Sequence, residues 1–95
     1  MKVATITKRD QYLGDIVDTR PGDYYVSVID GTRYALLAGP FTTHQEALNM
    51  VERTKDLAQT LDSRAVFYGF GTCRTDTRIE GVPRLGILNA QLGLS

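Results

Sequence analysis

The sequence predicts an α+β fold in a single small domain, residues 1–95, with an antiparallel β-sheet of three to five strands and one α-helix packed on one face. Three observations predict it. Residues 24–37 have the pattern of a β-hairpin, residues 43–61 that of an amphipathic helix, and residues 64–73 that of a buried strand. A chain of 95 residues is too short for two separate cores, so one domain follows.

The first twenty residues alternate weakly between apolar and polar side chains, which predicts one strand. The pair Pro21-Gly22 ends this segment, because proline presets φ and glycine tolerates the positive φ of a tight turn. A new element is expected to start at Asp23.

Two β-prone runs, 24–29 and 32–37, flank Asp30-Gly31, a pair that favours a two-residue type I′ turn. We expect Ile29 to lie opposite Thr32. One face then carries Tyr24, Val26, Val28, Arg33, Ala35 and Leu37, and the other carries Tyr25, Ser27, Ile29, Thr32, Tyr34 and Leu36. The first face is the expected core. The second is either half-covered or an exposed aromatic surface.

The spacing of Thr43 and Glu46 is that of a capping box, in which each side chain accepts a hydrogen bond from a backbone N–H at the helix start. The helix is expected to run to about Leu61. Its apolar stripe is formed by Ala47, Met50, Val51, Thr54, Leu57, Ala58 and Leu61.

Residues 64–73 have bulky side chains on both parities, which predicts a central strand covered on both faces. Gly69 and Gly71 share one face, where another element could approach closely. Residues 74–81 are expected to form a loop, and 82–94 a short strand or an irregular tail.

Composition excludes several classes of protein. Eleven basic residues balance eleven acidic ones, and 42% of residues are hydrophobic, as in an ordinary globular domain. We expect a cytoplasmic location without a membrane span, because no apolar run is long enough to cross a bilayer and the start does not resemble a signal peptide. One cysteine and one histidine are too few for a disulfide or a usual zinc site.

The residues with chemical potential do not form a catalytic pattern, so we expect no enzyme, no catalytic residues, no cofactor and no metal. The motif Gly69-x-Gly71 is followed by Arg74 and not by a third glycine opening a helix, as a phosphate-binding loop requires. His44 is expected to be solvated in the first turn of the helix, without a catalytic partner. Cys73 is expected in the core, with a reactive thiol as the alternative.

Binding is therefore the predicted activity, and its candidate surface combines sheet side chains with a basic loop. Residues 63–95 carry four arginines and two acidic residues, a net charge of +2. We expect a non-catalytic module that binds a protein partner or itself, with a homodimer as one form. The alternative is single-stranded or structured nucleic acid, stacked on tyrosines and steered by arginines. The candidate residues are Tyr25, Ser27, Tyr34, Arg74, Arg78 and Arg84.

Two resemblances bear on this expectation. The segment 38–43, Ala-Gly-Pro-Phe-Thr-Thr, followed by Glu46-Ala47, resembles the Gly-Pro-Phe turn and helix start of sporulation-related repeat (SPOR) domains, which implies the turn-to-helix geometry but not their cell-wall ligand. Together with residues 67–72 and 86–89, the chain is similar to short uncharacterised proteins of bacterial phages and integrated mobile elements. That resemblance implies an accessory protein that binds host or phage macromolecules.

Overall fold

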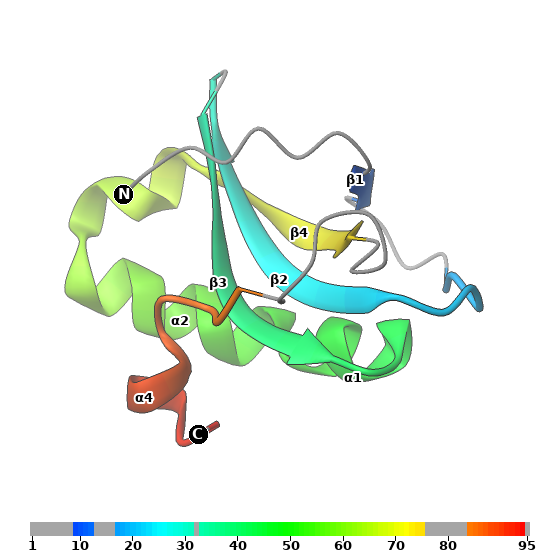
Figure 1. Ribbon diagram of the computed structural model, residues 1–95. Helices are drawn as coiled ribbons and strands as arrows, with labels where there is room; N and C mark the ends of the chain where they lie inside the picture. Colours follow the sequence, from blue (N-terminus) through cyan, green and yellow to red (C-terminus); the bar gives the residue numbers. More distant parts are fainter. Residues whose placement is uncertain (1–8, 13–16, 32, 76–83, 95) are drawn as a thin grey trace.

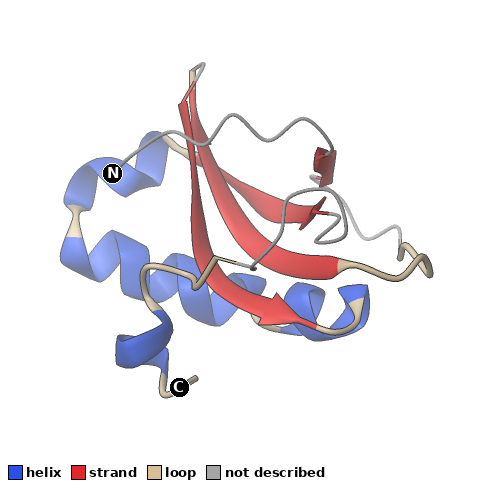
Figure 2. Cartoon of the chain, viewed as in Figure 1, coloured by secondary structure: helices blue, strands red, loops and turns tan. Residues whose placement is uncertain are grey.

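An antiparallel sheet of four strands forms the centre of the computed structural model, which describes residues 9–12, 17–31, 33–75 and 84–94 (Figure 1). The strand order is β1-β4-β2-β3, so β4 is central as predicted. The predicted α+β class is confirmed, and α1, α2 and α4 lie on one face of the sheet (Figure 2). The elements are β1 (Arg9–Tyr12), β2 (Asp23–Asp30), β3 (Arg33–Phe41), α1 (His44–Asn49), α2 (Val51–Leu61), η1 (Ser63–Phe67), β4 (Gly69–Thr75) and α4 (Asn89–Leu92).

The β2–β3 hairpin forms, but its register differs by two residues from the prediction. Asp30 lies opposite Arg33, where opposite charges stabilise a directly facing pair. Because side chains alternate every two residues, this shift leaves the predicted faces unchanged near the turn. An irregularity further along places Ala38, and not Leu37, opposite Val26.

Side chains on both faces of the sheet are buried. Under the helices, Val26, Ala38 and Leu92 form a core with Met50 and Leu57 packed against it. On the opposite face, a second small core joins Tyr25, Leu36 and Cys73, with Tyr34 packed against it. The predicted core face is confirmed at Val26, and the second face is covered too.

The predicted helix 43–61 is divided at Met50, whose backbone N–H bonds to the carbonyl of Ala47 (3.0 Å) in a tightened turn. Its predicted start is confirmed. The Glu46 N–H donates to Thr43 Oγ1 (3.3 Å), and the Thr43 N–H donates to Glu46 Oε1 (3.2 Å). This capping box fixes the direction in which α1 leaves β3.

A Thr43→Ala variant should therefore lower the free energy of unfolding by about 1 kcal/mol, because one helix N–H loses its acceptor. Hydrogen bonds from the hydroxyls of Thr42 and, to a lesser extent, Thr43 hold the pKa of Glu46 below its usual value. The variant loses the Thr43 hydroxyl, so the pKa of Glu46 should rise. Chemical denaturation and a carboxyl titration would measure both. Thr60→Ala is the control, because its exposed hydroxyl bonds only within α2. Equal losses in the two variants would contradict a specific capping role.

The predicted strand 64–73 is wrong in its first half. Residues 63–67 form a 3-10 helix, η1, and the strand runs from Gly69 to Thr75. The Asp62 carboxylate accepts from the Arg64 N–H (3.0 Å), and the Ala65 N–H donates to the Asp62 carbonyl (2.9 Å). These local bonds begin a helical turn and override the β-propensity of the residues that follow.

The segment formed by residues 84–88 covers the outer edge of β3. The N–H groups of Gly86 and Ile87 donate to the carbonyls of Gly39 and Leu36, each at 3.0 Å. The side chain of Asn89 adds two more bonds, because its Oδ1 accepts from the Gly39 N–H (3.0 Å) and its Nδ2 donates to the Gly39 carbonyl. The predicted C-terminal strand or tail is thus this segment followed by the short helix α4.

Candidate functional site

Three of the six residues of the predicted binding surface, Tyr25, Ser27 and Arg74, are buried. Tyr25 is 1% exposed and Ser27 is fully buried, so neither side chain is available to a ligand. Tyr34 is half-buried against the second core, and Arg84 is exposed. Arg78 lies outside the described residues. Of the two alternatives for this face, half-covered or exposed, the exposed one is excluded at Tyr25.

The 84–88 segment explains the burial of Tyr25. The Tyr25 hydroxyl donates to the backbone carbonyl of Arg84 (2.8 Å), while its ring packs against Leu36 and Cys73. Burial raises the pKa of this hydroxyl, and the nearby charge of Asp23 raises it further. Tyr25 is therefore a neutral core residue that anchors the C-terminal segment.

Arg74 was predicted to belong to the binding surface, but only 7% of it is exposed, so this part of the prediction is corrected. Its guanidinium donates through Nε (3.0 Å) and through Nη2 to the carbonyl of Pro21. The cation is thus used to hold the segment before β2. Cys73 is fully buried, which confirms its predicted place in the core.

His44 is the most unexpected residue of the structure. It begins α1, where the sequence predicts a solvated ring, yet only 1% of it is exposed. Its Nδ1 accepts a hydrogen bond from the backbone N–H of Asp18 (2.7 Å), and its Nε2 lies 2.7 Å from Thr72 Oγ1 on β4. Because Nδ1 is an acceptor, the ring proton is on Nε2 and is donated to Thr72. His44 thus joins α1, β4 and the residues before β2.

Three more side chains complete this polar cluster, which we call the His44 junction: Asp18, Arg20, Tyr24, His44, Thr72 and Arg74. The Tyr24 ring stacks on His44, with 5.0 Å between centroids and 12° between planes. The Tyr24 hydroxyl donates to the carbonyl of Arg20. Arg20 in turn forms an ion pair with Asp18 (2.6 Å) and is the more exposed member of that pair.

Burial favours the neutral forms of His44 and Tyr24 within the His44 junction. Desolvation lowers the pKa of His44 below 6.5, and the Asp18 carboxylate opposes this by attracting the imidazolium. Burial raises the pKa of Tyr24, and the charge of Asp18 adds to it. With both ring nitrogens of His44 bonded inside the protein, the arrangement positions backbone segments and does not direct a base toward solvent. Among the described residues, no group of three or more His, Cys, Asp or Glu side chains is placed to hold a metal ion.

A different surface is exposed and apolar. Leu61, at the end of α2, and Val66, in η1, are each 57% exposed, and Phe67 is 87% exposed. We call these three residues the 61–67 patch. Sequence reasoning missed it, because it placed residues 66 and 67 in a buried strand.

Charged side chains of both signs border the 61–67 patch. Arg64 lies between its members and forms an exposed ion pair with Asp62 (3.2 Å). The hairpin tip with Asp30 lies near η1, because Ile29 pairs with Gly69, two residues after the end of η1. Arg33 lies opposite Asp30 at the hairpin tip. The border therefore combines two acids and two arginines.

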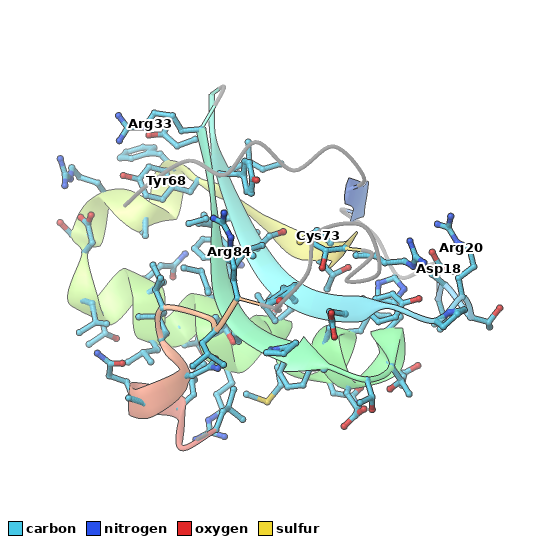
Figure 3. All side chains as sticks on the ribbon, viewed as in Figure 1. Asp18, Arg20, Arg33, Tyr68, Cys73 and Arg84 are labelled. Atoms are coloured by element: carbon cyan, nitrogen blue, oxygen red, sulfur yellow. The ribbon has the colours of Figure 1, made fainter. Side chains whose placement is uncertain are left out.

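Comparisons with known proteins add no relative: no protein family model, no curated protein and no solved structure matches this chain. Within the described residues, no helix is long and apolar enough to cross a membrane. What the structure defines is a small α+β protein with a buried polar junction at one end of its sheet and an exposed apolar patch at the other (Figure 3).

Proposed function

We propose that this chain is a non-catalytic accessory binding module, of phage or mobile-element origin and cytoplasmic, that binds a protein surface through the 61–67 patch. The observation that carries the proposal is the exposure of Phe67 together with Leu61 and Val66. One exposed apolar side chain is ordinary, but large ones gathered at one place are typical of protein interfaces. Aromatic residues are enriched in such interfaces.

The partner that fits this surface best is a second copy of the chain. In a two-fold interface the same surface faces itself, so acids on one copy can meet bases on the other. The border of the 61–67 patch supplies both, because Asp30 lies opposite Arg33 and Asp62 is paired with Arg64. The net charge is zero, so two copies do not repel each other at long range.

Nucleic-acid binding has less support. Stacking on the sheet requires exposed aromatic rings and free cations, but Tyr25 and Arg74 are buried and hydrogen-bonded to backbone carbonyls. A chain without net positive charge also lacks the general attraction to phosphates. We therefore keep protein binding as the proposed function.

A Phe67→Ser variant should weaken self-association by roughly 100- to 10,000-fold, because each of the two copies loses the burial of one phenylalanine side chain, about 1.5–3 kcal/mol per copy. Sedimentation equilibrium of the natural chain and the variant, over a wide range of concentration, would measure the dissociation constants. The variant should keep its fold, since the ring is exposed in the single chain.

Ile87→Ser is the matched control, because Ile87 is also an exposed apolar residue, at 53%, but lies on the 84–88 segment. Its dissociation constant should equal that of the natural chain. A natural chain that stays monomeric at the highest concentration would contradict the proposal. Equal weakening by both substitutions would show that the 61–67 patch is not the interface.

A further inference from the structure

The residues 17–22, which we call the 17–22 segment, are held at the end of the sheet by three side chains. His44 accepts from the Asp18 N–H, Tyr24 donates to the Arg20 carbonyl, and Arg74 donates to the Pro21 carbonyl. Tyrosine and arginine remain donors over the physiological pH range. The bond to His44 is different, because it depends on an unprotonated nitrogen.

Protonation of His44 would reverse the role of Nδ1. The imidazolium is a donor at both nitrogens, so Nδ1–H would face the N–H of Asp18 at a separation of 2.7 Å. Two donors cannot share this position, and the backbone of Asp18 would have to move away. The bond from Nε2 to Thr72 survives protonation, because Nε2 is already the donor.

We propose that His44 is an acid-sensitive latch, which holds the 17–22 segment against α1 and β4 when its imidazole is neutral and releases Asp18 when the imidazole takes up a proton. The two states of the latch are the two protonation states of His44 Nδ1, which accepts a hydrogen bond when unprotonated and donates one when protonated. After release, the Asp18 carboxylate can turn toward Nδ1–H and exchange its ion pair with Arg20 for one with the imidazolium.

Desolvation of the ring and the charge of the Asp18 carboxylate set the pH of this transition. The other charged and titratable groups on the elements around His44 are Arg20 from the 17–22 segment, Tyr24 from β2, Arg74 from β4 and Glu46 within α1. Desolvation lowers the pKa of His44 and outweighs the attraction of the Asp18 carboxylate. The latch therefore opens below pH 6.5, and the folded state loses stability as pH falls below 6.5, because the unfolded chain then binds the proton more readily.

The latch lies away from the 61–67 patch, and the inference does not depend on the proposed function. In Figure 3, Asp18 and Arg20 are at one end of the molecule, while Arg33 and Tyr68, beside the 61–67 patch, are at the other. If self-association were not observed, the latch would be unaffected. If the latch were not observed, the proposed self-association would be unaffected.

Nuclear magnetic resonance of the natural chain tests the latch directly. The ring nitrogens of His44 and the backbone amide of Asp18 would be followed from above to below pH 6.5. The Asp18 amide resonance should move with the same midpoint as His44, as its hydrogen bond is lost. The Arg64 amide, which donates to the Asp62 carboxylate and not to a histidine, is the internal control and should stay constant through that midpoint.

Two variants sharpen the test. In His44→Asn the side-chain oxygen can replace Nδ1 as an acceptor that does not titrate, so the Asp18 amide should no longer respond at the pH where His44 of the natural chain titrates. In Asp18→Asn the loss of the carboxylate should shift the His44 midpoint to lower pH. An Asp18 amide unchanged while His44 titrates would overturn the inference. So would loss of circular dichroism with the same midpoint, because that is global unfolding and not a local release.

Discussion

An Asn89→Ala variant should unfold with a free energy lowered by about 2–4 kcal/mol, since two buried hydrogen bonds to one backbone group disappear together. The Asn89 side chain is 5% exposed, and it both accepts from the N–H of Gly39 and donates to its carbonyl. The side chain of Asn89 thus makes the two backbone hydrogen bonds at the edge of β3 that a neighbouring strand would otherwise make. Without it, the backbone bond from the Gly86 N–H to the Gly39 carbonyl remains, but the N–H of Gly39 loses its acceptor.

Gln91→Ala is the control for this prediction, because Gln91 is exposed on the same helix, α4. Its free energy of unfolding should remain within about 0.5 kcal/mol of the natural value. Urea denaturation of both variants would measure the difference. Similar losses for the two substitutions would mean that the stability comes from the helix α4 itself and not from the two hydrogen bonds between Asn89 and Gly39.

The signals that predicted the fold correctly are local in the chain. The hairpin follows from two β-prone runs around Asp30-Gly31, and the start of α1 follows from Thr43 and Glu46, whose side chain and backbone bond to each other. The register was wrong by two residues, but an even shift preserves the alternation of faces.

The error at residues 63–67 shows where local propensity fails. Val66 and Phe67 are residues typical of strands, and the prediction used their side chains alone. The deciding group is the Asp62 carboxylate, which accepts from the Arg64 N–H and begins a helical turn. The side chain of Asp62 therefore favours the helical turn of residues 63–67 over a strand. In that turn Val66 and Phe67 are exposed and belong to the 61–67 patch.

The polar site could not be predicted, because its contacts are distant in sequence. His44 is bonded to Asp18 and Thr72, which are 26 and 28 residues away, and no spacing rule links such positions. The burial of Tyr25 depends on a carbonyl 59 residues further along the chain, at Arg84. Strand alternation gives the face on which Tyr25 lies, but it does not say what covers that face.

A Gly39→Ala variant should show the largest loss of the substitutions considered, about 3–5 kcal/mol in the free energy of unfolding. Gly39 has φ +126°, a conformation that L side chains rarely adopt. A Cβ there would also lie 2.7 Å from the backbone oxygen of Tyr24 and 2.8 Å from Cδ2 of Tyr25. Both neighbours belong to β2, so relief of the overlap requires the two strands to separate.

Gly31→Ala separates the two causes, because Gly31 also has a positive φ, +63°, but an added Cβ would meet no atom within 4 Å. Its cost should be only the backbone term, about 1–2 kcal/mol. The difference between the two variants, measured by urea denaturation, then reports the close approach of β3 to β2 together with the less accessible φ of Gly39. A Gly39→Ala variant as stable as Gly31→Ala would show that the strands can move apart at little cost. The irregular pairing around Val26 would then be a flexible part of the sheet. The two hydrogen bonds between Asn89 and Gly39 would also contribute less to stability than their geometry indicates.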